Sequence, residues 1–121
     1  MAGIRGIRGA TQVDRDDRDE ILDAVSELLT TLLERNNLTP AALVSVIFTA
    51  TPDLTAEFPA YAARRLGITD VPLLCAAEIA VAGAMPRVLR LLAHVETDLG
   101  RDQVRHVYLR GAQGLRSDLP R

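Results

Sequence analysis

The sequence predicts an α/β fold with a small mixed sheet, in the order β-α-β-α-β-α-β. Residues 3–12 and 43–51 are rich in the β-branched residues typical of strands, and an amphipathic helical pattern separates them. Short strand-like and helical segments then continue to alternate along the chain. This order predicts helices packed on a sheet, with parallel pairing for at least the first crossover. A length of 121 residues predicts one domain, 1–121.

The first strand contains the segment IRGIRGAT, residues 4–11. A helix is disfavoured here because Gly6 and Gly9 would each cost about 1 kcal/mol. Alternate residues of a strand face opposite sides, so Arg5 and Arg8 point to opposite faces of the sheet. We expect at least one of them to lie on a covered side, where a charged group needs a partner.

The charged run DRDDRDE, residues 14–20, is interpreted as the solvated start of a helix, where the helix dipole favours acidic side chains. Apolar residues at helical spacing follow, and the helix is expected to end near Arg35 with Asn36 or Asn37 as a left-handed stop. Thr39 and Pro40 predict only a short helical turn.

The remaining elements are assigned from apolar runs and their Gly and Pro boundaries. They are a buried strand at 43–51 ended by the turn 51–53, a short helix at 58–67, a strand at 71–77, a helix at 83–97, a strand at 104–110 and a loosely ordered tail at 111–121. Four strands leave exposed sheet edges, and 48% of the residues are hydrophobic, so we expect a homo-oligomer.

Composition excludes several classes of protein. The net charge is −2, so no basic surface indicates nucleic-acid binding. The single cysteine, Cys75, forms no internal disulfide and is consistent with the reducing cytoplasm. The N-terminus has no apolar signal segment, and the longest apolar stretch, 79–95, is interrupted by Pro86, Arg87 and Arg90, which argues against a membrane span.

Candidate chemical groups lie near the expected strand ends. Arg8, the 51–53 turn, and Cys75 with Glu78 occupy such positions, where ligands of open α/β sheets bind, and Tyr108 lies on the last strand. Arg90 falls on the expected helix 83–97, where plain solvent exposure is an equally simple interpretation.

Other reactive residues have plain structural interpretations. His94 and His106 are isolated in the sequence, so each is interpreted as a structural or surface residue. Cys75 is interpreted as a small buried hydrophobe. The set of candidates lacks a nucleophile–base pair and suits a small polyanion.

Six motifs resemble the trimeric α/β class of chorismate mutase. They span about residues 3–119: IRGIRGAT (4–11), SVIFTATPDLTAEFPA (45–60), VPLLCAAEI (71–79), LRLL (89–92), DQVRHVYL (102–109) and LRSDL (115–119). The resemblance implies a trimeric pseudo α/β barrel with sites at the subunit interfaces. It also implies conversion of chorismate to prephenate by a Claisen rearrangement, a step toward phenylalanine and tyrosine, without cofactor or metal.

The resemblance also implies the site residues. One wall would be Arg8, Cys75, Glu78, Arg90 and Tyr108; the neighbouring subunit would add Phe58, Ala60, Tyr61 and Arg64; and Leu74, Leu115 and Arg116 would complete the surround. Tyr61 replaces a lysine found in some members, and Gly111 and Gly114 would loosen the segment that carries Arg116.

The reaction is pericyclic and explains why no catalytic pair is needed. Arg90 would stabilise the negative charge on the ether oxygen, with Glu78 accepting the ring hydroxyl. Arg8 would bind a carboxylate, with Tyr108 as a further donor, and Arg5 would be structural or solvent-facing. A non-catalytic trimeric binding module for a small carboxylate metabolite is the alternative.

Overall fold

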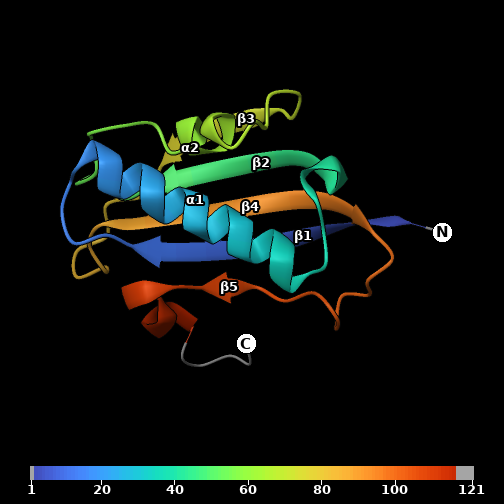
Figure 1. The fold of residues 1–121 in the computed structure, drawn as a ribbon. Coiled ribbons are helices and arrows are strands. Elements are labelled where there is room, and N and C mark those ends of the chain that lie inside the picture. Colours follow the sequence, from blue (N-terminus) through green and yellow to red (C-terminus); the bar gives the residue numbers. More distant parts are fainter. Residues whose placement is uncertain (1, 117–121) are drawn as a thin grey trace.

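The protein is built on a five-stranded sheet with helices on one side (Figure 1). The computed structural model describes residues 2–116. The elements are β1 (Gly3–Gln12), α1 (Arg18–Arg35), the 3-10 turn η1 (Pro40–Ala42), β2 (Leu43–Ala50), α2 (Ala60–Arg65), β3 (Leu73–Ala77), β4 (Val88–Thr97), β5 (Val107–Tyr108) and the 3-10 helix η2 (Arg110–Arg116). Among these residues no helix has both the length and the apolar character needed to cross a bilayer.

The strands lie in the order β3-β2-β4-β1-β5, and the sheet is mixed. β4 pairs antiparallel with both β1 and β2, whereas β2 pairs with β3, and β1 with β5, in parallel. The predicted α/β class with a mixed sheet is therefore confirmed. The expected direct parallel pairing of the first two strands is wrong, because β4 lies between them.

The predicted helix at 83–97 is wrong, since residues 88–97 form the central strand β4. The side chains of Leu89, Leu91, Ala93, Val95 and Thr97 are all buried, which is the two-residue period of a strand. These apolar residues also fit helical spacing, and a short apolar run does not distinguish the two by periodicity alone. Because residues 88–97 pair with β1 on one side and β2 on the other, they form a strand. The order of elements is therefore β-α-β-α-β-β-β.

The last strand is shorter than the predicted 104–110. Asn36, buried at the end of α1, donates to the Arg105 carbonyl at 2.9 Å and accepts from the Arg105 N–H at 2.8 Å. These bonds replace ladder bonds to β1, so β5 begins only at Val107. Residues 111–116, expected within a loose tail, belong to η2, which packs against β1.

Helix α1 has the limits that the sequence predicts. The Asp17 side chain caps its first turn by accepting from the Glu20 N–H, and Asn37 has a φ of 54° just after its end. Gly9 lets the helix approach β1 closely, because a Cβ at that position would lie 3.1 Å from the Leu28 side chain.

The two faces of the sheet differ in character. The covered face packs against α1 and α2 and carries buried residues such as Ile7, Phe48 and Leu91. Pairing register places the alternate residues on the other side, which we call the open face. Its members include Ile4, Arg8, Ile47, Thr49, Leu74, Arg90 and Leu92.

Candidate active site

A row of polar side chains crosses the open face. Arg90 of β4 pairs with Thr49 of β2 on one side and with Ala10 of β1 on the other, and Ala10 pairs in turn with Tyr108 of β5. Arg8 lies two residues before Ala10 along β1 and therefore on the same face. The sheet thus brings Arg8, Arg90 and Tyr108 to one surface from three strands.

Glu78 holds Arg90 in place on this surface. Its Oε2 lies 3.1 Å from Arg90 Nε and accepts a hydrogen bond from the Thr49 hydroxyl at 2.7 Å. The Glu78 side chain is 16% exposed and that of Arg90 is 46% exposed. Within residues 2–116, Oε1 of Glu78 accepts no hydrogen bond, and the terminal nitrogens of Arg90 are likewise uncommitted. One acceptor and several cationic donors therefore stand side by side at a half-exposed position.

Arg8 is fixed through its backbone. Its N–H donates to His106 Nδ1 at 3.0 Å, at the point where β5 has not yet begun. The guanidinium has no carboxylate partner within the described chain. His94 contacts the Ser45 hydroxyl at 3.0 Å, so both histidines are hydrogen-bonded structural residues.

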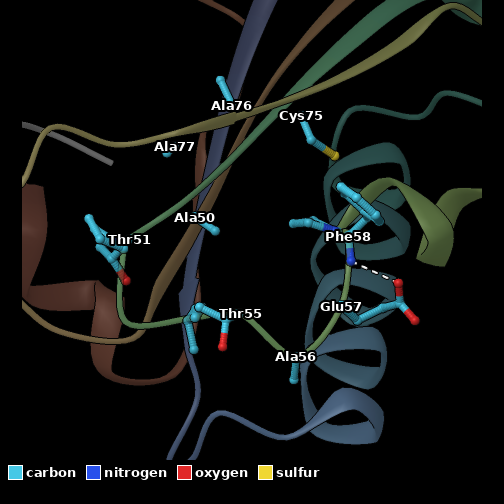
Figure 2. Close-up of a pocket in the computed structure, with 12 residues that line it drawn as sticks. Ala50, Thr51, Thr55, Ala56, Glu57, Phe58, Cys75, Ala76 and Ala77 are labelled. Carbon is cyan, nitrogen blue, oxygen red and sulfur yellow. Dashed lines mark hydrogen bonds between the residues drawn. The ribbon is translucent and has the colours of Figure 1, made fainter.

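A second group of predicted site residues lies at the β3 edge of the sheet, around a cavity of about 540 Å³. Phe58, Cys75, Ala50 and Ala76 are among the residues that line it, and Figure 2 shows the Cys75 thiol directed toward the Phe58 ring. Phe58 is 72% exposed. The Cys75 side chain also packs against the core on the covered face, whereas its neighbour Leu74 lies on the open face.

Helix α2 carries the other members of this second group. Ala60 is buried at its first residue, and Tyr61 and Arg64 are exposed. Arg64 forms no ion pair with any residue in the range 2–116. Leu115 is half-buried near the end of η2, and the side chain of Arg116, like residues 117–121, lies outside the described part.

The two groups face opposite sides of the sheet within one chain. Arg8, Arg90 and Tyr108 are on the open face, whereas the side chain of Cys75, beside Phe58, packs on the covered face. The expectation that the Cys75 side chain shares one wall with Arg8 and Arg90 is therefore wrong, because the two-residue period of β3 turns it to the other side of the sheet.

Sequence reasoning missed two supporting residues. Thr49 lies inside the run SVIFTAT, where its role as a partner of Glu78 depends on the pairing with β4. His106 was noticed only as an isolated histidine, and its contact with Arg8 spans 98 residues. Within the range described, no group of three or more His, Cys, Asp or Glu side chains is placed to hold a metal ion.

The cationic groups that gather around Arg90 on the open face suit an anionic ligand, and comparisons with known proteins identify the class. The family model for chorismate mutase type I matches residues 4–119. The chain belongs to this family, which makes it an isomerase.

Two curated relatives are similar over almost their full length. Chorismate mutase AroH of Thermus thermophilus is 52% identical, over 96% of each chain. Chorismate mutase AroH of Bacillus subtilis is 46% identical, over 96% of this chain and 92% of the relative. A solved chorismate mutase from Clostridium thermocellum superposes with a TM-score of 0.90 at 43% identity, over 91% of this chain and 98% of that one.

The contact between Thr49 and Glu78 yields a first prediction. Thr49→Val removes the hydroxyl at nearly constant volume, and we expect the catalytic efficiency kcat/KM for chorismate to fall about five- to tenfold. Thr49→Ser is the matched control, because it keeps the hydroxyl and should retain most of the activity. Equal losses in the two variants would show that packing, and not the hydrogen bond, explains the effect.

Proposed function

We propose that this protein converts chorismate to prephenate by a Claisen rearrangement, with Arg90 as the principal catalytic residue. The observation that carries the proposal is the contact of 3.1 Å between Glu78 and Arg90 on the open face. A guanidinium held in this way is oriented before substrate arrives.

Charge development explains the role of Arg90. As the C–O bond of chorismate breaks, negative charge grows on the ether oxygen, and no proton has to move. A fixed donor aimed at that oxygen is worth about 3–4 kcal/mol, by analogy with oxyanion holes. Guanidinium stays charged at every physiological pH and offers several donors in one plane, so Arg90 suits both the ether oxygen and an adjacent carboxylate.

The neighbouring groups fix the substrate. Arg8, whose guanidinium has no carboxylate partner among the described residues, is proposed to bind a substrate carboxylate, with Tyr108 as a second donor. Oε1 of Glu78 is proposed to accept the ring hydroxyl. Holding chorismate in its compact conformer supplies the entropic part of the rate acceleration.

A homotrimer would complete the site. The Phe58 group lies on the other side of the sheet from Arg90 in one chain, which supports a site shared between subunits. Phe58, Ala60, Tyr61 and Arg64 of a neighbouring subunit would then close over the open-face groups. Leu74, Leu115 and Arg116 are proposed to border the same site.

The β3 segment around Cys75, where Leu74 lies on the open face, is proposed to help position the substrate. The Cys75 thiol is not proposed as a nucleophile, because a pericyclic reaction needs none. A single free thiol suits a reducing compartment, so we assign the reaction to the cytoplasm. The reaction as proposed uses neither metal nor cofactor.

A direct assay tests the function. Purified protein mixed with chorismate should cause the absorbance of chorismate to disappear, with prephenate as the product. If the folded protein binds chorismate without accelerating its conversion, the protein is instead a binding module for a small carboxylate metabolite.

The role of Arg90 is tested by two substitutions. Arg90→Ala removes the charge, and Arg90→Lys keeps the charge but loses the planar fork. Both should lower kcat by about 100-fold or more, with a smaller rise in KM. A change in KM alone would mean that Arg90 binds ground state and transition state equally.

The wild-type kcat should stay nearly constant between about pH 6 and 9, because the proposed rearrangement moves no proton and this range lies above the reference pKa values of carboxylates.

Subunit mixing tests the shared site. Arg90→Ala and Arg64→Ala damage opposite walls, so each homotrimer should be strongly impaired. Random exchange between equal amounts of the two should restore both walls in about one quarter of the sites. Recovery of activity after mixing, with a trimeric mass by light scattering, is the expected result. A mixture no more active than its components would argue against shared sites.

A further inference from the structure

We propose that Asp16 is a positioning residue that holds the segment carrying Phe58 in place for substrate binding. The role of Phe58 itself rests on the function proposed above. Asp16 lies just before α1, in the charged run that the sequence presents as the solvated start of a helix.

The carboxylate of Asp16 takes three hydrogen bonds from the segment before Phe58. Oδ1 accepts from the backbone N–H of Thr55 at 2.9 Å and from that of Ala56 at 3.0 Å. Oδ2 accepts from the Thr55 hydroxyl at 2.8 Å. We call these contacts the Asp16 clamp. They join residues 39 and 40 positions apart in the sequence, so they fix the segment 54–58 to the start of α1.

A second set of contacts, from Arg18 and Glu57, holds the same segment beside the Asp16 clamp. Arg18 Nε lies 2.8 Å from Glu57 Oε2, and Glu57 Oε1 accepts from the Phe58 backbone N–H at 2.9 Å, as Figure 2 shows. The Arg18 guanidinium also lies 5.5 Å from the centre of the Tyr61 ring. The backbone on the N-terminal side of Phe58 is therefore held at Thr55, Ala56 and Phe58 itself.

The clamp matters because Phe58 is 72% exposed, so its side chain has little packing to hold it in the isolated chain. Its position follows mainly from its backbone, so an ordered backbone places the ring before substrate binds. Ordering a binding group in advance lowers the entropic cost of association. We therefore expect loss of the clamp to weaken substrate binding more than it slows the chemical step.

Protonation states support the clamp at neutral pH. The Thr55 hydroxyl, followed by the Thr55 and Ala56 N–H groups, lowers the pKa of Asp16 below its usual value of 3.8. The pKa of Glu57 is also lowered, first by the Phe58 N–H and then by Arg18. Since both folded-state pKa values are depressed, the stabilisation from these contacts is fully present above the ordinary values of 3.8 and 4.5 and is lost as pH falls through the lower folded-state values.

Three variants test the clamp. Asp16→Ala removes all three acceptor contacts, and we expect KM to rise about tenfold with a smaller change in kcat. Asp16→Asn should restore most of the affinity, because its amide oxygen still accepts both N–H groups and the Thr55 hydroxyl turns to accept from the amide nitrogen. Thr55→Val, which removes one contact, should raise KM less than Asp16→Ala does and keeps the test available if that variant folds poorly.

Asp23→Ala is the matched control. It removes an exposed carboxylate from α1 that forms no ion pair or hydrogen bond with residues 2–116, so KM should not change. Hydrogen exchange of the Thr55 and Ala56 amides should accelerate in Asp16→Ala and stay slow in Asp23→Ala. Unchanged amide protection, or an unchanged KM, in Asp16→Ala would overturn the proposal.

A double-mutant cycle separates positioning from general stability. If Asp16 acts through Phe58, the variant that combines Asp16→Ala with Phe58→Ala should have the KM of Phe58→Ala alone. If the two substitutions instead raise KM by factors that multiply in the double variant, the proposal is overturned and the role of Phe58 stays intact. If Phe58→Ala alone has the wild-type KM, the proposed role of Phe58 fails and the clamp loses its function with it.

Discussion

The antiparallel pairing of β4 with both β1 and β2 is the constraint on which the rest of the structure depends. It places Arg90 between Thr49 and Ala10, and so determines which neighbours the guanidinium has. Strand register is set where one face of a sheet is buried, because a shift of one residue reverses the facing of every side chain. Packing of the covered face against α1 therefore also orients the polar groups on the open face.

The strand pairing also orients the Arg90 guanidinium before a substrate binds. Glu78 comes after β3, and its N–H donates to the Ala50 carbonyl at 2.9 Å at the end of β2. Its side chain reaches Thr49 and Arg90 from that position. The ion pair is half-exposed, so its contribution to stability is small, and its importance lies in orienting the guanidinium. A site that works by electrostatic stabilisation needs such orientation before the reaction begins.

Much of the fold could be predicted from the sequence, because local signals decide it. The limits of α1, its left-handed stop, the strand 43–51 and the turn at Pro40 depend on residues close in sequence. The predicted helix at 83–97 is wrong because the apolar residues of 88–97 fit both the helical and the strand period. Only the pairing of this segment with β1 and β2 shows that it is a strand. Similarly, β5 is short because Asn36, which lies 69 residues away, holds the Arg105 backbone.

For the candidate site too, some features follow from the sequence and others only from the tertiary structure. The motif resemblance predicts one wall from Arg8, Cys75, Glu78, Arg90 and Tyr108. The register brings Arg8, Arg90 and Tyr108 to one face, and Glu78 joins them through its side chain. The Cys75 side chain lies on the other face. No local signal indicates that Thr49 contacts Glu78 or that Asp16 holds Thr55, because these contacts depend on tertiary structure.

Neighbouring residues of β4 face opposite sides of the sheet and have different roles. Leu89, Leu91 and Ala93 serve packing, while Arg90 serves the polar surface between them. A substitution on one face of β4 leaves the facing of the residues on the other face unchanged. A change in strand length is different, because it would exchange the two faces and place a charged group in the core. Insertions and deletions in this family are therefore expected to collect in the loops around β4 and to spare the strand itself.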